Sequence, residues 1–362
     1  MRSLLRRWTW IVPALALAGL TLTWGRALPL GVVPLVALLL IGAVLAAVHH
    51  AEVIAHRVGE PFGSLVLAVA VTVIEVALII TLMISGKEGA ETLARDTAFA
   101  AVMITCNGIV GLSLLLGGAR HRLVRFNPEG AGAALAVVAT LTTLTLVLPR
   151  FTVSAPGAQF SGAQLAFVAV AALLLYGVFV QTQTNRHRDF FLPVDDAGKN
   201  IDREDHAEPP STRTTVVSVL LLLVALVAVV GLAKGVSPSI EAGVAAAGIP
   251  NSFVGVVIAL LVLLPEGLAA SRAALRNRIQ TSLNLGLGSA MASIGLTIPS
   301  IAIASIWLPG PLDLGLGPVQ IVLFALTMVV ATLTVVPGRA TRLQGIVHLI
   351  LLAAFVFLAI SP

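Results

Sequence analysis

The sequence predicts an all-α polytopic membrane protein with about eleven transmembrane helices. Its 362 residues are 58% hydrophobic and only 11% charged, whereas about a quarter of the residues in a soluble domain are charged. Eleven apolar segments are long enough to cross a hydrocarbon core of about 30 Å as helices. Two of these segments, one in each half of the chain, share an ungapped pattern that ends in glutamate. We therefore expect an extra first helix followed by two inverted five-helix repeats.

The order of these segments sets the domain boundaries. Arg2, Arg6 and Arg7 precede the first segment as in a signal peptide, but no small-residue cleavage site follows at the right place, so we expect a retained helix. The predicted domains are an extra first helix (1–28), a first repeat (29–182), a linker loop (183–215) and a second repeat (216–362). The apolar segments fall at about 9–24, 29–48, 62–85, 96–118, 131–148, 164–182, 216–234, 250–270, 282–306, 318–336 and 343–361.

The basic residues predict the orientation, because Lys and Arg gather in cytoplasmic connections. With the N-terminus in the cytoplasm, all but five of the 22 Lys and Arg lie on inner connections. The C-terminus then lies outside, and the expected location is the bacterial inner membrane. The five basic residues left outside are Arg26, Lys87, Arg95, Arg150 and Lys234.

The same distribution excludes nucleic acid as a partner. A pI near 10.3 would suit nucleic acid if the basic residues formed one exposed face, but here they flank apolar segments. Membrane lipid and cations are the expected partners, and no oligomeric state is predicted. Cys106 is the one cysteine, so neither an intrachain disulfide nor a thiolate metal cluster can form. We expect no cofactor.

The linker loop is the one long polar segment, and the orientation places it in the cytoplasm. Its acid-rich part, Asp195 to Glu208, could sense a cation. Mixed charge and paired prolines are more typical of a solvated, partly disordered tether, which is the interpretation we favour.

Glu75 lies at the centre of the apolar segment from Phe62 to Ser85. Twenty-four helical residues rise about 36 Å, so the fourteenth residue lies near the bilayer midplane. An acidic side chain there costs roughly 2.5 to 3.5 kcal/mol and usually faces a protein interior or an ion path. Glu75 is therefore a candidate functional residue, with structural hydrogen bonding as the alternative.

Glu266 repeats this arrangement in the second half. The segment Phe253 to Glu266 aligns without a gap on Phe62 to Glu75, with phenylalanine and glutamate in register. Because each repeat has five helices, the two glutamate helices run in opposite directions. Inverted repeats with a midplane carboxylate each are typical of secondary transporters that expose one site to each side in turn.

The two carboxylates predict exchange of a cation for a proton. Cation and proton compete for the same oxygens, because the ligand must be deprotonated to bind metal. Two glutamates completed by hydroxyls and carbonyls would suit a hard cation such as Ca²⁺. Thr72 lies one turn before Glu75, and Pro265 frees a carbonyl near Leu261. A hydroxyl bonded to its own helix and a plain kink are the alternatives.

The helices that follow the glutamate helices are also rich in polar and small residues. Asn107 and Ser289 lie deep enough to offer side-chain oxygens to an ion, whereas glycine and serine alone would indicate close helix packing. We favour the site interpretation over packing. The residues are Thr105, Cys106, Asn107, Gly108 and Gly111 in the first half and Asn284, Gly286, Gly288, Ser289, Ser293 and Thr297 in the second.

A histidine-rich stretch precedes the first glutamate helix at the cytoplasmic mouth. His49, Glu52 and His56 share one helical face, but the metalloprotease order H-E-x-x-H is absent, which argues against metal catalysis. Glu52 and His56 are candidates for a gate or pH sensor. An interfacial turn is the alternative, and the one we favour.

These motifs resemble the calcium/cation antiporter superfamily, and within it the bacterial calcium/proton (sodium/proton) antiporters of the Cha type. The pattern A-x-E, R-x-G, glycine and then the G-N-A-T-E glutamate is similar to Ala51, Glu52, Arg57, Gly59, Gly63 and Glu75. In the second half the glutamate, the K-N-K-like turn and the G-S-S helix are matched by Glu266, Arg276-Asn277-Arg278 and Gly288-Ser289, ending in Pro299.

The resemblance implies a ten-helix inverted core with an added helix. It also implies that Glu75 and Glu266 are shared by cation and proton, with Asn107 and Ser289 as neighbours. The family asparagines are replaced by Thr72 and Leu263, which removes amide oxygens and weakens the expectation of strict calcium selectivity.

We therefore expect a secondary active transporter, not an enzyme, that exports Ca²⁺ in exchange for H⁺ by alternating access. The rival within transport is a monovalent Na⁺(K⁺)/H⁺ antiporter. A cation channel would lack proton coupling, and a membrane-embedded hydrolase would need a nucleophile or metal set that the apolar segments do not contain.

Overall fold

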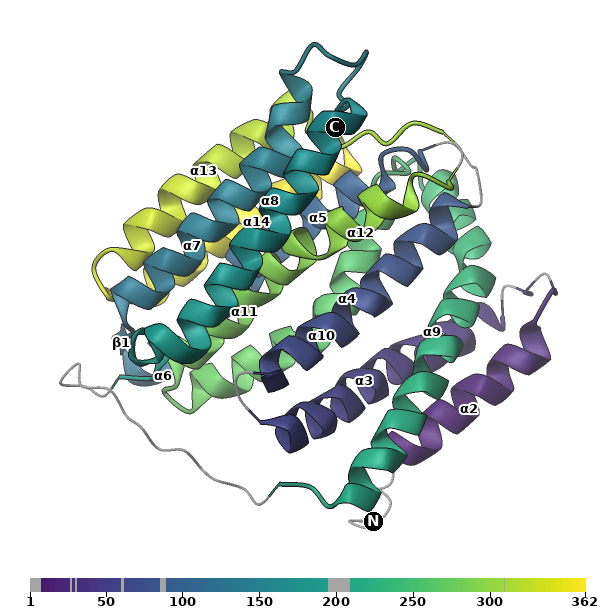
Figure 1. The fold of residues 1–362 in the computed structure, drawn as a ribbon, viewed down its shortest axis with the longest axis horizontal. Coiled ribbons are helices and arrows are strands. Elements are labelled where there is room, and N and C mark those ends of the chain that lie inside the picture. Colours follow the sequence, from purple (N-terminus) through teal and green to yellow (C-terminus); the bar gives the residue numbers. More distant parts are fainter. Residues whose placement is uncertain are drawn as a thin grey trace. The chain divides into compact units, whose positions relative to one another are not determined.

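The computed structural model describes residues 8–26, 28–29, 31–59, 62–84, 89–194, 209–308 and 310–362. These residues are almost all helical (Figure 1). The helices are α2 (Trp8–Thr23), α3 (Val33–Val58), α4 (Phe62–Met83), α5 (Leu93–Met103), α6 (Val110–His121), α7 (Pro128–Thr142), α8 (Gly162–Gln181), α9 (Thr212–Ala246), α10 (Phe253–Leu275), α11 (Ile279–Gly295), α12 (Thr297–Ala304), α13 (Pro318–Val335) and α14 (Arg342–Ile360).

Short irregular elements join or extend these helices. Two strands, β1 (Val124–Arg125) and β2 (Arg339–Ala340), pair antiparallel. The π-helical turns are η1 (Ile104–Ile109), η2 (Thr143–Val147) and η4 (Thr182–Arg186), and the 3₁₀ turns are η3 (Leu148–Arg150) and η5 (Arg188–Phe191).

Ten helical segments of the described chain are long and apolar enough to cross a membrane. They coincide with ten of the eleven predicted spans, which confirms the polytopic all-α class. The remaining span, α2, has 16 residues and rises about 24 Å, less than the hydrocarbon thickness of about 30 Å. The protein is thus a multi-pass membrane protein with one shorter apolar helix near its N-terminus.

The described chain forms two compact units, which we treat separately. Unit 1 comprises residues 1–90 and 206–254, and unit 2 comprises residues 91–205 and 255–362. Unit 1 therefore contains α2, α3, α4 and α9, and unit 2 contains the other helices. Each unit combines helices from both predicted repeats, so the repeat boundaries remain a sequence prediction.

In unit 1, α3 packs against α2, α4 and α9. Small residues bring these helices close together, as is common in membrane proteins. A Cβ added at Gly231 of α9 would clash with Leu20 of α2, and one added at Gly42 of α3 would lie 2.9 Å from Val12 of α2. The short first helix is therefore held tightly by its neighbours.

In unit 2, α14 packs closely on α6, and α11 packs on α7. A Cβ added at Gly345 would lie 2.5 Å from the main-chain nitrogen of Leu115. The pairing of β1 with β2, with Val124 opposite Ala340, joins the connection before α7 to the connection after α13. Val124 and Ala340 belong to an apolar cluster that also includes Leu114, Ile279 and Leu283.

Polar side chains cap the N-termini of several helices. Asn127 accepts hydrogen bonds from the first N–H groups of α7, and Pro128 occupies its first turn, where a missing N–H costs nothing. Ser161 and Thr341 form capping boxes at the starts of α8 and α14. Asn277 adopts φ 60° in the turn between α10 and α11, a left-handed conformation that asparagine tolerates better than most residues.

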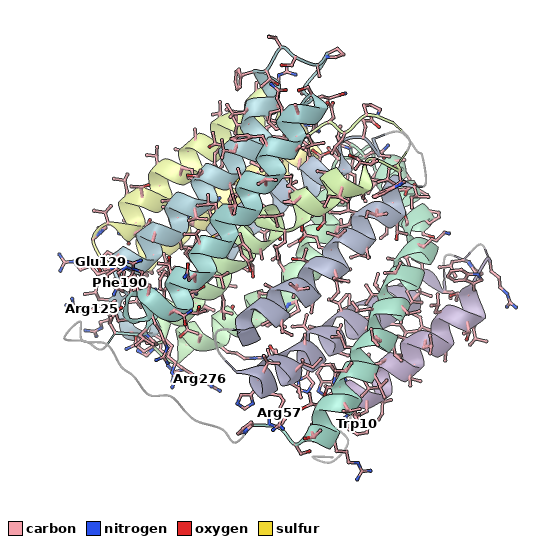
Figure 2. The ribbon with its side chains drawn as sticks, in the orientation of Figure 1. Trp10, Arg57, Arg125, Glu129, Phe190 and Arg276 are labelled. Carbon is pink, nitrogen blue, oxygen red and sulfur yellow. The ribbon has the colours of Figure 1, made fainter. Side chains whose placement is uncertain are left out.

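The first part of the linker loop is ordered. Phe191 is buried, and its ring contacts that of Phe179 at a centroid distance of 5.6 Å. The Phe190 carbonyl lies where a Cβ on Gly130 would be, and Figure 2 labels Phe190 near Glu129, the residue before this glycine. The expected tether is therefore shorter than 183–215, and its acid-rich part, residues 195–208, lies outside the described residues.

Candidate functional site

Glu75 lies on α4, in unit 1, and its residue is only 2% exposed. It is the fourteenth residue of the helix, about 20 Å from the helix start. The buried side of α4 also contains Thr72, one turn earlier, whereas Val69 and Val73 are exposed. The sequence prediction that Thr72 and Glu75 share one helical face is confirmed.

Glu266 lies on α10, in unit 2, and is half-buried. It is also the fourteenth residue of its helix, so the two glutamates lie at the same distance from the starts of their helices. The helix continues through Pro265, which lacks the N–H that would bond to the carbonyl of Leu261. The ungapped register predicted from the sequence is thus the register of the two helices.

Asn107 is fully buried in η1, the π-helical turn between α5 and α6. Its amide nitrogen donates to Thr327 Oγ1 at 3.0 Å, and its Oδ1 lies 3.0 Å from Nδ1 of His348. Thr334 Oγ1 lies 3.1 Å from the other ring nitrogen of His348. We call these four residues the Asn107 network.

The Asn107 network has a consistent pattern of donors and acceptors. With Oδ1 of Asn107 as an acceptor, Nδ1 of His348 carries the proton and Nε2 accepts from the Thr334 hydroxyl. All four residues are buried, and buried polar groups of this kind are costly to leave unsatisfied. The structure therefore gives Asn107 a second role, joining η1 to α13 and α14, beside the role of cation ligand predicted from the sequence.

The small residues around Asn107 support close packing. A Cβ on Gly111 would lie 2.9 Å from Cβ of His348, and one on Gly108 would lie 3.1 Å from Leu352. These glycines thus allow α14 to approach η1 and α6. Close helix packing therefore explains why glycine occupies positions 108 and 111. This is the packing interpretation that the sequence left as the alternative.

Ser289 is half-buried on α11, in unit 2. Asn284, earlier on the same helix, has structural partners: its Nδ2 donates to the Phe191 carbonyl at 2.7 Å, and its Oδ1 accepts from Gln280 at 2.9 Å. Asn284 therefore fixes the ordered start of the linker loop to α11. The role of Ser289 as a cation ligand remains a prediction.

The histidine-rich stretch forms the last part of α3, which continues as a helix through Val58. Glu52 and His56 are both exposed, and their role as a gate or pH sensor stays a prediction. His50, in contrast, is buried between Ser218 Oγ at 3.2 Å and the Thr9 carbonyl at 2.9 Å, so it joins α3 to α9 and α2.

Arg57, also at this end of α3, bonds to Pro210 and Thr212 at the start of α9, within unit 1. Figure 2 shows Arg57 at this position. The arginine of the family-like motif therefore has a structural partner where the linker loop enters α9.

Two polar sites escaped the sequence interpretation. His348 carries no carboxylate, the group that marks a candidate site inside an apolar segment. Asp96 lies at the edge of its segment, beside Arg95, so hydropathy does not predict its burial. Asp96 is 4% exposed, pairs with Arg95 at 2.8 Å and accepts a hydrogen bond from Thr92 at 2.9 Å. This neighbouring cation accounts for a buried aspartate without a cation site.

No group of three or more His, Cys, Asp and Glu that could hold a metal ion occurs among the described residues. A cation site built from described side chains therefore needs neutral oxygens besides its carboxylates, as hard cations accept. The hydroxyls of Thr72 in unit 1 and Ser289 in unit 2 are predicted ligands of this kind.

Two spanning helices that each have a glutamate as the fourteenth residue define a class: a helical membrane transporter of charged solutes. A family model described as "Sodium/calcium exchanger protein" matches residues 28–185 and 217–361. The chain belongs to this family. It is a cation/proton antiporter of the family, and it is a transporter rather than an enzyme.

Two relatives match nearly the whole chain. A protein of Sinorhizobium fredii named as an ionic transporter, y4hA, is 48% identical over 98% of this chain and 96% of its own length. The sodium-potassium/proton antiporter ChaA of Escherichia coli is 37% identical over 95% of this chain and 94% of its own length. A Ca²⁺/H⁺ antiporter of Aphanothece halophytica is 23% identical over 86% of this chain and 84% of its own length.

Solved structures share the fold. YfkE matches with a TM-score of 0.73 at 16% identity, covering 98% of this chain and all of that one. The H⁺/Ca²⁺ exchanger CAX matches with a TM-score of 0.70 at 15% identity, covering 97% and 92%. Both confirm the expected antiporter fold.

Proposed function

We propose that Glu75 and Glu266 carry the exchanged cation and the proton in turn. The observation that supports this most directly is their matched position, each the fourteenth residue of a spanning helix. A deprotonated carboxylate binds the cation, and its release allows the same oxygens to take up a proton. Because one group cannot hold both, cation and proton move in opposite directions.

We propose Na⁺ and K⁺ as the preferred cations, with Ca²⁺ as the second candidate. ChaA, named as a sodium-potassium/proton antiporter, is 37% identical to the chain, and the named Ca²⁺/H⁺ antiporter of Aphanothece halophytica is 23% identical. Thr72 and Leu263 also replace the amides that would help to complete the six to eight oxygens that Ca²⁺ prefers. Calcium export, favoured by the sequence alone, still fits two carboxylates that together balance a divalent charge.

We further propose alternating access in a bacterial inner membrane, with the N-terminus in the cytoplasm and the C-terminus outside. The distribution of Lys and Arg supports this orientation. Cysteine labelling offers a direct measurement, because Cys106 is buried. A cysteine placed at Ser361 should react with an impermeant reagent from the outside only.

Flux in proteoliposomes with an imposed pH gradient tests the cargo. Na⁺, K⁺ and Ca²⁺ are compared at equal ionic strength, with an acid-trapped dye reporting proton movement. We expect Na⁺ and K⁺ to dissipate the pH gradient at lower concentrations than Ca²⁺. A response to Ca²⁺ alone would make calcium the cargo, and cation flux without proton movement would indicate a channel.

A further inference from the structure

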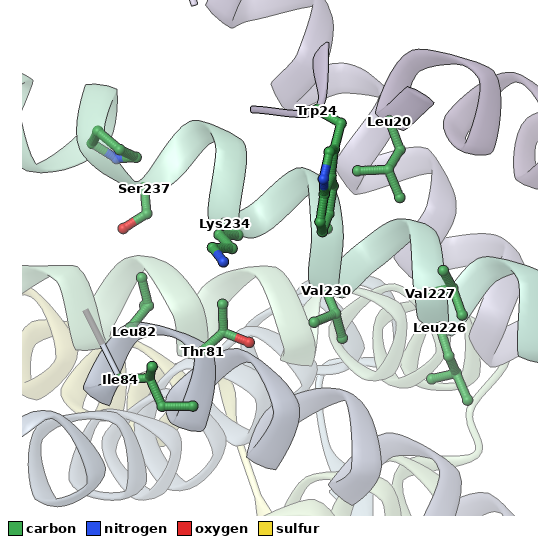
Figure 3. A pocket seen from close by; sticks show the side chains of 12 residues that line it. Leu20, Trp24, Thr81, Leu82, Ile84, Leu226, Val227, Val230, Lys234 and Ser237 are labelled. Carbon is green, nitrogen blue, oxygen red and sulfur yellow. The ribbon is translucent and has the colours of Figure 1, made fainter. Parts of the chain in front are cut away.

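Unit 1 contains a cavity of about 810 Å³ among α2, α4 and α9. This volume lies in the range of small-molecule sites, about 300–1,000 Å³. Figure 3 shows Lys234 projecting from α9 into this space, with Trp24 on one side and the end of α4 on the other. The lining residues are Leu20, Trp24, Thr81, Leu82, Ile84, Leu226, Val227, Val230, Gly231, Lys234, Ser237 and Pro238.

The cavity is apolar along most of its length and positively charged at one end. Lys234 is exposed, and its Nζ lies 5.9 Å from the centre of the Trp24 ring. Ser237, one turn later, donates to Glu241 at 2.6 Å, so this carboxylate has a partner on its own helix. Arg26 adds a second positive charge just beyond Trp24.

The charged end lies at the depth of lipid headgroups. Lys234 is the twenty-third residue of α9, so it lies about 33 Å from the helix start, close to the full hydrocarbon thickness. Trp24 follows the last residue of α2, and tryptophan is typical of the membrane interface. Leu226 and Val227 lie about 10–12 Å further from this interface, toward the bilayer centre.

We propose that this cavity binds an anionic phospholipid, with its phosphate at Lys234 and one acyl chain between α2, α4 and α9. The charge at interface depth and the apolar walls beneath it match the two parts of such a lipid. A free phosphate ion would use Lys234 but gain nothing from the apolar walls. An apolar partner would fill the walls but gain nothing from the cation.

The occupied cavity would touch the helix that carries Glu75. Thr81, Leu82 and Ile84 line the cavity. Thr81 and Leu82 lie about two turns after Glu75 on α4, and Ile84 directly follows the end of this helix. A bound lipid therefore supports the end of this helix, which connects the site to the proposed exchange without contributing a ligand to the cation.

Native mass spectrometry of the full-length protein tests the proposal. The probes are phosphatidylglycerol and phosphatidylcholine with identical acyl chains, titrated onto delipidated protein. Lys234→Gln should weaken phosphatidylglycerol binding about fivefold, the factor expected for one basic residue near the lipid charge, and should leave phosphatidylcholine binding unchanged. Val230→Trp, which fills the cavity, should remove both.

Arg150→Gln is the matched control, because Arg150 is also a basic residue at a helix end but does not line the cavity. It should bind phosphatidylglycerol as the wild type does. Equal phosphatidylglycerol binding by wild type and Lys234→Gln would overturn the proposal. Displacement of the lipid by inorganic phosphate alone, or retention of the lipid by Val230→Trp, would also overturn it.

A second measurement does not depend on mass spectrometry. Phosphatidylglycerol with brominated acyl chains should quench the fluorescence of Trp24, since this ring lines the cavity. Trp24→Phe provides the background from the other tryptophans. Quenching that is the same in wild type and Trp24→Phe would show that the acyl chain does not enter this cavity.

Discussion

At the scale of single residues, charge and hydrogen bonding separate the roles of the polar side chains inside the spanning helices. Glu75 and Glu266 are acidic and occupy the same position on their helices. Asn107 and His348 are neutral in the pattern described, and each is bonded to residues on other helices. The hydrogen bonds support a structural role for the Asn107 network in unit 2, and the role of the two glutamates in exchange is our proposal.

Glu75→Gln and Glu266→Gln should each abolish coupled exchange. Glutamine keeps nearly the same volume and one carbonyl oxygen, but it removes both the negative charge and the titratable proton. Proton movement driven by cations in proteoliposomes measures the loss, and the matched positions predict similar defects. Glu129→Gln, at an exposed position on α7, is the control and should exchange normally. Near-normal exchange by either midplane mutant would refute the shared carboxylate mechanism.

Asn107→Leu and His348→Phe should each lower stability by about 1–3 kcal/mol, because each leaves buried partners unsatisfied. The double mutant should lose less unfolding free energy than the two single mutants lose together. The expected difference, the coupling energy, is about 0.6 kcal/mol, the average for hydrogen bonds within membranes. Unfolding of the four proteins of this double-mutant cycle in detergent measures the coupling.

Thr332→Val provides the control for this cycle. Thr332 lies on α13, as Thr327 does, but it is exposed and bonds only to the Met328 carbonyl of its own helix. If the losses of unfolding free energy at Asn107 and His348 are strictly additive, the two residues are not coupled, which would contradict the hydrogen bond between them. If Asn107→Leu instead changed the apparent affinity for the cation while His348→Phe did not, Asn107 would act as a ligand, as the sequence predicted.

At the scale of helices, close contacts between glycines and the main chain decide where unit 2 can pack tightly. On α14, Gly345 faces Leu115 and the Gly111 carbonyl of α6. These contacts bring the two backbones close together, as is typical of helix pairs in membranes. Helices in lipid associate without a hydrophobic driving force, so close packing at small residues stabilises the pair.

Gly345→Val should separate α14 from α6 and lower the thermal stability strongly. A Cβ there would lie 2.5 Å from a main-chain nitrogen and 2.7 Å from a carbonyl oxygen, neither of which can rotate away. Thermal unfolding in detergent measures the effect. Gly177→Ala in α8 is the control, since a Cβ there meets nothing within 4 Å and alanine favours helix by about 1 kcal/mol. Equal melting temperatures for wild type and Gly345→Val would show that this contact is not tight.

At the scale of the whole molecule, the linker loop divides into an ordered start and a further part outside the described residues. Phe191 and the Asn284 contact hold the start to unit 2, and Arg57 holds the residues before α9 to α3 in unit 1. The connection between these two points is the stretch of the loop that our tether prediction concerns.

Deleting Asp195 to Glu208 and joining the ends with a flexible linker of equal length should leave exchange intact. Mixed charge and prolines favour a solvated tether over part of a packed site. Cation-driven proton movement in proteoliposomes measures exchange. The comparison variant is Phe191→Ala, which removes a buried aromatic and should lower stability by about 3–5 kcal/mol. Loss of all exchange in a correctly inserted deletion variant would show that the loop does more than connect.

The sequence alone determined the approximate limits of ten spanning segments, the two glutamates and their common register. It also counted α2 as an eleventh span, although that helix has only 16 residues. Hydropathy and helical rise are local properties in a membrane, because every backbone polar group must bond within its own helix. The resemblance of motifs such as Ala51-Glu52 and Gly288-Ser289 was likewise local, and it identified the superfamily to which the matched family belongs.

Only the tertiary structure decided which polar residues meet across the chain. Asn107 bonds to Thr327 and His348, which lie 220 and 241 residues away, and His50 bonds to Ser218, 168 residues away. No periodicity within one helix predicts such partners, because they depend on which helices pack together and on where glycines permit close approach. The cavity at Lys234 has the same origin, since it is formed by three helices that only folding brings together.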